Sequence, residues 1–175
     1  MIHVTEAIKL CGLSDMEFVG EFALERGAAV HAAIALDAVG ELDEASVDPV
    51  HVAPRLASFR AWRAQANPKI VCVESTVRNE AMAYVGRLDQ IVELPALGIT
   101  VIDVKNGAAA NWHPYQTALY ALAWVSERGG ATPHRGCLYL DPNGKPAKFV
   151  QHHDRRDFER AKAIVTVAYI VKESA

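Results

Sequence analysis

Four short segments between residues 70 and 104 constrain the fold most, because β-branched and aromatic residues are concentrated in them. Each is short enough for a strand and they follow one another closely: Ile70–Glu74, Met82–Gly86, Leu88–Val92 and Ile99–Val104. Further along, Cys137–Leu140 and Phe149–Gln151 predict a hairpin across Asp141–Gly144, whose residues favour a turn. The sequence therefore predicts a sheet that occupies the middle of the chain.

Helical signals surround these strands. A capping box at Ser14–Glu17 predicts a helix that runs to about Asp37, and apolar spacing predicts another from about Pro54 to Ala66. Pro114 opens a third helix, which Tyr115 to Arg128 continue, and Asp154 caps a fourth that runs from Arg155 to about Lys172. Between the first two helices, Glu41 to Asp48 form an acidic loop. This order of elements predicts a mixed α/β domain.

Length and composition set the protein class. The 175 residues fit a single domain, 1–175, and 51% hydrophobic with 22% charged residues indicate a globular chain. Neither an apolar run of about 18 residues nor a signal peptide is recognisable, so we expect no membrane span and a cytoplasmic location. Three widely spaced cysteines indicate neither a disulfide framework nor a metal cage, and we expect them to be buried small apolar groups.

Charge is distributed unevenly along the chain. Residues 1–50 hold 10 acidic residues against 2 Lys and Arg, whereas residues 51–175 hold 11 against 16. A formal net charge of -3 argues against a general polyanion binder. The basic second part nevertheless permits a local surface for nucleic acid.

Two aspartates and a lysine carry the strongest chemical signal. Asp89 lies in one predicted strand, and Asp103 and Lys105 close another, where the period of two puts both side chains on one face. If the strands are neighbours, two carboxylates and an ammonium converge. Paired carboxylates repel each other and favour binding of a hard divalent cation, and a nearby lysine can polarise a water. Alternatively, Asp103 and Lys105 form an ordinary exposed ion pair.

Five motifs in order resemble the PD-(D/E)xK nuclease superfamily, and most closely its RecB-like and phage exonuclease branch. They extend from Arg26 to Tyr120: Arg26-Gly27-Ala28-Ala29-Val30-His31, Gly86-Arg87-Leu88-Asp89, Ile102-Asp103-Val104-Lys105, Gln116 and Tyr120. The resemblance implies a restriction-endonuclease-like αβββαβ core with helices flanking a central mixed β-sheet. It also implies a bacterial or phage-infected cell as the setting.

Carried over residue by residue, the resemblance assigns roles to nine positions. Metal ligands are His31, Asp89, Asp103 and the backbone carbonyl of Val104; the catalytic set is Asp89, Asp103, Lys105 and Glu74; substrate-binding residues are Gln116, Tyr120 and Arg87. Lys105 would orient and activate the attacking water. Purely structural roles are the alternatives for some of these residues. His31 is then a core histidine, and Tyr120 is a buried tyrosine with Gln116 as its polar neighbour.

The sequence also departs from the family pattern. Asn106 replaces a usual threonine, and the loop Ala108–Ala110 has no polar side chain. The four cysteines of the iron–sulfur members are absent. His113 and the pair His152-His153 are weaker metal candidates, because no third ligand lies near them in the sequence. Trp112 and Tyr115 could stack on a base or simply pack.

The function implied is hydrolysis of DNA phosphodiester bonds with Mg²⁺ or Mn²⁺, by an exonuclease of the RecB-like or phage recombination type. Expected partners are DNA, as linear duplex ends or single strands, together with a recombination or annealing protein and further copies of the chain. The leading alternative is an inactive nuclease-fold module that binds nucleic acid or protein. A third, a site-specific endonuclease, needs a base-reading loop that is not recognisable.

Overall fold

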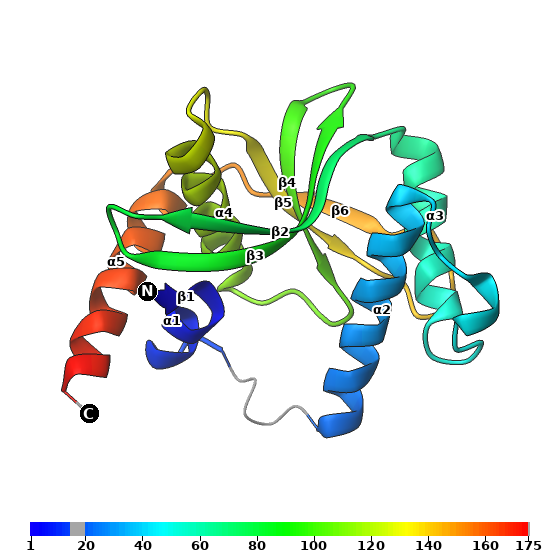
Figure 1. Ribbon diagram of the computed structural model, residues 1–175, viewed down its shortest axis with the longest axis horizontal. Helices are drawn as coiled ribbons and strands as arrows, with labels where there is room; N and C mark the ends of the chain where they lie inside the picture. The colour runs from blue at the N-terminus through cyan, green and yellow to red at the C-terminus, as the bar shows by residue number, and fades with distance from the viewer. Residues whose placement is uncertain (15–19, 175) are drawn as a thin grey trace.

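The computed structural model describes residues 1–14 and 20–174, which form a six-stranded mixed sheet with helices on both faces (Figure 1). The strands are β1 (Ile2–His3), β2 (Lys69–Asn79), β3 (Tyr84–Leu94), β4 (Gly98–Lys105), β5 (His134–Tyr139) and β6 (Lys148–Gln151). Their order is β1-β3-β4-β5-β6, with β2 on β3. Pairs β2–β3, β3–β4 and β5–β6 are antiparallel, whereas β1–β3 and β4–β5 are parallel.

The helices are α1 (Val4–Leu10), α2 (Glu21–Val39), α3 (Ala53–Ala66), α4 (His113–Arg128) and α5 (Arg156–Glu173). The predicted order of α3, β2, β3, β4, α4, β5, β6 and α5 is confirmed, and so is the mixed α/β fold class with its αβββαβ core. Asp154 contributes to the start of α5, because its Oδ1 accepts the Arg156 N–H at 2.9 Å. Within the acidic loop, Glu44–Ser46 form a single 3₁₀ turn.

Two predicted strands are one strand in the structure. Tyr84–Gly86 of the first predicted strand and Leu88–Val92 of the second lie in β3, which β2 pairs along its length, whereas Met82 and Ala83 lie in the turn before it. Gly86 produced the break in the sequence pattern, yet it is needed within the strand: an added Cβ would lie 2.5 Å from Cε1 of Tyr120. The glycine therefore lets α4 pack closely on the sheet.

Two cores lie on opposite faces of the sheet. One lies under α1, α4 and α5, and includes Ile8, Tyr84, Leu88, Ile91, Leu119 and Val165. The other lies under α2 and α3, and includes Val30, Leu56, Phe59, Ile102, Val104 and Leu138. Fully burying each large apolar side chain stabilises the fold by about 1.5–3 kcal/mol.

The sequence missed the first elements of the chain. β1 and α1 were not predicted, although α1 packs on α5 and β1 pairs in parallel with β3. The predicted capping box begins at Ser14, but its residues 15–17 lie outside the described residues, and α2 is described from Glu21. Burial of all three cysteines was wrong in part: Cys137 is buried, but Cys11 and Cys72 are partly exposed. Among the described residues, no helix is long and apolar enough to cross a membrane.

Candidate active site

The site lies where β3 changes its partner. On one edge, β3 pairs with β1 at Tyr84 and Val85, and with β4 from Gln90 onward. Between these pairings, this edge of β3 has no ladder partner, and Asp89 occupies the gap. The Val104 N–H, which faces the gap from β4, bonds instead to Oδ2 of the Asp89 carboxylate at 2.6 Å. The Asp89 carboxylate is thereby fixed in the middle of the sheet.

Three side chains from three elements meet on one side of this gap, and we call them the acidic group: His31 of α2, Glu74 of β2 and Asp89 of β3. Each offers a ligand atom within 4.8 Å of the others. Nδ1 of His31 lies 3.1 Å from Oδ1 of Asp89. Burial lowers the pKa of His31, but the negative charge of Asp89 and its hydrogen bond outweigh this and raise the pKa overall.

Glu74 has an unusual backbone. Its φ is +46°, in the left-handed region that non-glycine residues rarely adopt, and it interrupts the β2–β3 ladder beside Asp89. Its Oε2 lies 2.6 Å from Nε of Arg87, whose side chain is 68% exposed at the rim. Burial and the neighbouring Asp89 raise the pKa of Glu74 against the opposing effect of Arg87. Strain of this kind is commonly kept at functional sites.

On the other side of the gap lies a second set, the lysine group: Asp103, Lys105, Gln116 and Tyr120. Nζ of Lys105 lies 2.7 Å from Oδ2 of Asp103 and donates to Oε1 of Gln116 at 2.7 Å. The amide of Gln116 in turn donates to the Tyr120 hydroxyl at 3.0 Å. Burial lowers the pKa of Lys105, but the adjacent Asp103 raises it above its usual value, so the amine is protonated.

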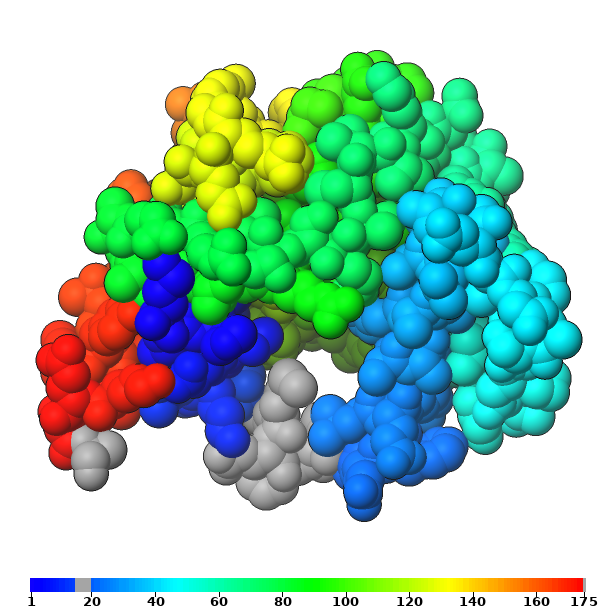
Figure 2. All heavy atoms as spheres, viewed as in Figure 1, coloured from blue at the N-terminus to red at the C-terminus, as the bar shows by residue number. Residues whose placement is uncertain are grey.

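Strand β5 supports the lysine group from behind. Cys137 and Tyr139 pair in register with Asp103 and Lys105, and the Cys137 thiol donates to Oδ2 of Asp103 at 3.6 Å. Trp112 covers the ammonium of Lys105, with Nζ 5.0 Å from the ring centroid. Both groups face a cavity of about 470 Å³, which His31, Asp89, Asp103, Lys105, Trp112 and His113 help to line. Figure 2 shows the molecule hollowed between α2 and the strands drawn in green.

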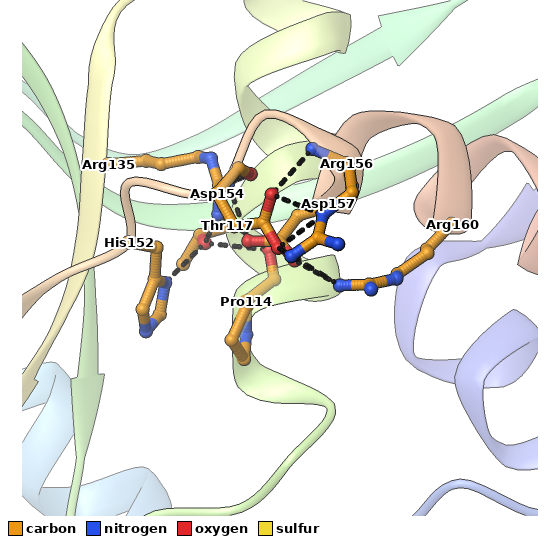
Figure 3. Close-up of polar contacts among 8 residues, drawn as sticks. All are labelled: Pro114, Thr117, Arg135, His152, Asp154, Arg156, Asp157 and Arg160. Carbon is orange, nitrogen blue, oxygen red and sulfur yellow. Dashed lines mark hydrogen bonds and ion pairs between the residues drawn. The ribbon is translucent and has the colours of Figure 1, made fainter.

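A buried arginine anchors the first turn of α4, which carries Gln116. Arg135 of β5 is 2% exposed and donates to the carbonyl oxygens of Pro114 and Asp154, both at 2.9 Å. It also donates to Thr117 at 3.3 Å and to the Asp157 carboxylate at 2.8 Å. Figure 3 shows this Arg135 network, with His152 turned toward the Thr117 hydroxyl. The network ties α4 and α5 to the sheet.

The structure thus brings the predicted site residues to one place. His31, Asp89, Asp103, Val104, Lys105, Gln116 and Tyr120 line the cavity, and Glu74 and Arg87 lie beside it with His31. Asp103, expected as a metal ligand, is 3% exposed and paired with Lys105. Glu74 instead lies in the group of potential metal ligands with His31 and Asp89. The ordinary exposed ion pair weighed for Asp103 and Lys105 is wrong, since the Asp103 side chain is buried and that of Lys105 is only 16% exposed.

Several neighbours of the site were not predicted. No sequence pattern indicates that Cys137 and Tyr139 lie beside Asp103 and Lys105. Their proximity comes from the parallel pairing of β4 with β5, and α4 separates these two strands in the chain. Among the described residues, His113 and His152-His153 belong to no group of three or more candidate metal ligands. His152 instead pairs through Nδ1 with the Thr117 hydroxyl at 2.9 Å.

The donor set of the acidic group fits a divalent metal ion. Two carboxylates and an imidazole offer hard oxygen ligands with one nitrogen, which Mg²⁺ and Mn²⁺ accept. Val104 adds to this fit: the N–H and C=O of one residue share a strand edge, so its carbonyl also faces the Asp89 gap. The strained Glu74 points its carboxylate into the same group.

Comparison with known proteins agrees with this geometry. A family model of the PD-(D/E)XK nuclease superfamily matches residues 28–169, and the chain therefore belongs to that superfamily. A crystal structure of a "putative exonuclease" from Eubacterium rectale shares the fold, with a TM-score of 0.63, 11% identity, and coverage of 99% of this chain and 81% of that one. LHK-Exo in complex with dAMP gives a TM-score of 0.43, 8% identity and coverage of 99% and 88%. No curated protein sequence matches the chain.

Proposed function

We propose that the protein is a metal-dependent deoxyribonuclease, and specifically an exonuclease of the RecB-like or phage recombination type. The observation that carries the proposal is the meeting of two complementary groups on one cavity: potential metal ligands on one side and a protonated lysine on the other. Its membership of a nuclease superfamily supports phosphodiester hydrolysis as the reaction. The restriction to DNA and to free ends comes from the resemblance of its motifs.

Lys105 acts as a cation and hydrogen-bond donor in this proposal. An ammonium has three N–H groups, of which one donates to Asp103 and one to Gln116, so the third is left for a water or a phosphate oxygen. Because Asp103 keeps the amine protonated, Lys105 orients the attacking water and stabilises the developing negative charge rather than removing a proton.

The remaining residues hold the reacting groups in place. His31, Glu74, Asp89 and the Val104 carbonyl, with Asp103 adjacent, would hold Mg²⁺ or Mn²⁺, and the bound ion would supply a Lewis acid for the phosphate and the water. Gln116 and Tyr120 fix the position of Lys105 through their hydrogen bonds. Arg87 at the rim is placed to bind the nucleic-acid backbone.

Cleavage of defined substrates tests the proposal. Purified protein is incubated with end-labelled linear DNA, closed circular DNA and single-stranded RNA, each in Mg²⁺, Mn²⁺ or EDTA, and Asp89→Asn serves as the inactive control. We expect linear DNA to be degraded from its ends in Mn²⁺ or Mg²⁺, with circles and RNA intact. DNA that is bound but not cut by the wild type would indicate an inactive binding module, and cut circles an endonuclease.

A further inference from the structure

His113, the first residue of α4, lines the cavity without belonging to either the acidic or the lysine group. The residue is 4% exposed, and its ring lies against that of Trp112, with centroids 4.3 Å apart and planes at 85°. Since Trp112 also covers Lys105, the imidazole and the ammonium share one wall of the cavity.

The hydrogen bonds of His113 fix its tautomer. The backbone N–H of Ala110 donates to Nδ1 at 3.3 Å, and a backbone amide cannot accept in return. The hydroxyl of Tyr139 also lies 2.8 Å from Nδ1, and a hydroxyl can donate to an unprotonated ring nitrogen. Nδ1 is therefore the unprotonated nitrogen, and the ring proton resides on Nε2.

The proton on Nε2 is available to a ligand. Nε2 has no hydrogen-bond partner among the described residues, and it is not one of the fully buried polar atoms that lack a partner. It therefore reaches accessible space, and the cavity is the accessible space that His113 lines.

The surroundings keep the ring neutral. Burial lowers the pKa of His113 to about 4, and the positive charges of Lys105 on β4 and His152 after β6 act in the same direction. Tyr139 of β5 faces Nδ1 as a donor, which also disfavours a second ring proton. Across the neutral pH range, His113 thus presents one N–H and no charge.

We propose that His113 is a further substrate-binding residue, whose neutral Nε2–H donates to a non-bridging oxygen of a nucleotide phosphate held next to Lys105. The inference rests on the proposed nuclease function and adds to it a phosphate contact outside the predicted motif residues. Tyr139 and Ala110 act as positioning groups, because they select the tautomer that directs the proton into the cavity.

Two isosteric substitutions separate this role from a structural one. In His113→Asn the side-chain oxygen replaces Nδ1 and keeps the bonds to Ala110 and Tyr139, but the donor at Nε2 is lost. In His113→Gln the amide nitrogen replaces Nε2 and keeps a donor toward the cavity. Hydrogen bonds to charged groups correspond to about 10- to 100-fold in an equilibrium or rate. We therefore expect kcat/KM on linear DNA to fall by about that factor in His113→Asn, through KM, and to be largely preserved in His113→Gln.

Two further measurements complete the test. Nitrogen NMR of labelled histidine in the free protein should show Nε2 protonated and Nδ1 unprotonated from pH 8 to pH 5.5, and a thymidine oligonucleotide added in Ca²⁺ should shift the Nε2 resonance. The loss in His113→Asn should also be equal at pH 6 and pH 8, since a neutral donor does not titrate there. Thermal melting checks that both variants fold.

The outcomes distinguish the two proposals. A wild type that cleaves DNA, together with an active His113→Asn or an inactive but folded His113→Gln, would overturn the role of His113 alone. An Nδ1–H tautomer would do the same. If the wild type neither binds the oligonucleotide nor cleaves DNA with any divalent ion, the proposed function and this inference both fail.

Discussion

The acidic group and the lysine group line the same cavity but differ in how their polar atoms are bonded. Asp103 is 4% exposed in its side chain, and both it and Lys105 are held by direct hydrogen bonds to neighbours. In the acidic group the side chains of His31 and Glu74 are 29% and 22% exposed, and Glu74 adopts a strained backbone. The lysine group is thus preorganised by bonds among its own members, whereas the acidic group bonds outward to Val104 and Arg87 and keeps two carboxylates and an imidazole together, an arrangement that a cation would complete.

Removing the lysine tests the preorganised side and should have the largest effect. We expect Lys105→Met to lower kcat by about 10² to 10⁴, because the donor to water and phosphate is lost. Its metal response should persist, since the acidic group is intact. Lys162→Met is the matched control: Lys162 forms an exposed ion pair with Glu159 at 3.0 Å, and its loss should leave cleavage unchanged. Near-normal turnover by folded Lys105→Met would remove Lys105 from the mechanism.

The Arg135 network behind the lysine group should contribute more to stability than any surface pair. Arg135→Met leaves the buried Asp157 carboxylate with only its longer contact to the half-exposed Arg160, at 3.3 Å, and losing one partner of a buried pair costs about 3–5 kcal/mol. Arg156→Met, whose arginine is 78% exposed, should cost less than about 1 kcal/mol in the same urea titration. Adding Asp157→Leu to Arg135→Met should recover much of the loss. Equal stabilities for the two arginine variants would show that the network is not an anchor.

The local parts of both regions could be predicted from the sequence. The alternation of side chains in a strand places Asp103 and Lys105 together, and the four-residue spacing in a helix places Gln116 beside Tyr120. The predicted order of strands and helices from Pro54 onward also matches the structure, because β-branched runs and caps are local signals.

The remaining features depend on long-range pairing that leaves no local signal. Gly86 lies within β3, where the absence of a side chain lets Tyr120 of α4 approach the strand. Nothing near Gly86 in the sequence reveals this contact. Along one edge of β3 the pairing partner changes from β1 to β4, and this change leaves the unpaired gap at Asp89. Similarly, Tyr139 fixes His113 from a parallel strand, so the tautomer is visible only in three dimensions.

Metal binding tests the acidic group. A divalent ion that binds only the folded protein stabilises it by about 2.7 kcal/mol at a hundredfold excess over Kd. We expect Mn²⁺ to raise the melting temperature of the wild type and to do so much less in Glu74→Gln. Arg87→Met should keep the full response or enlarge it, because Arg87 competes with a cation for Glu74. Equal shifts in the wild type and Glu74→Gln would exclude Glu74 as a ligand.

The smallest expected effect is a loss of stability at low pH through His152, which contacts the Arg135 network. Burial, with Arg135 adding to it, lowers the pKa of His152 to about 4, below the value near 6.5 of an unfolded chain. Between these values the unfolded chain binds a proton that the folded one excludes, so stability rises with pH across this window and is lost as pH falls. Because the Thr117 hydroxyl accepts from Arg135 and lies 2.9 Å from Nδ1 of His152, the neutral ring completes the network.

His152→Asn should keep a polar atom beside the Thr117 hydroxyl, at the position of Nδ1, but remove the titration. Its stability should therefore decline less than that of the wild type between pH 7 and pH 5, as measured by chemical denaturation in EDTA, where metal binding does not contribute. His134→Asn, at an exposed position on the same strand as Arg135, serves as the control and should keep the wild-type slope. If His152→Asn and the wild type lose stability in parallel, His152 is not held neutral by the network, and acid would act on the protein elsewhere.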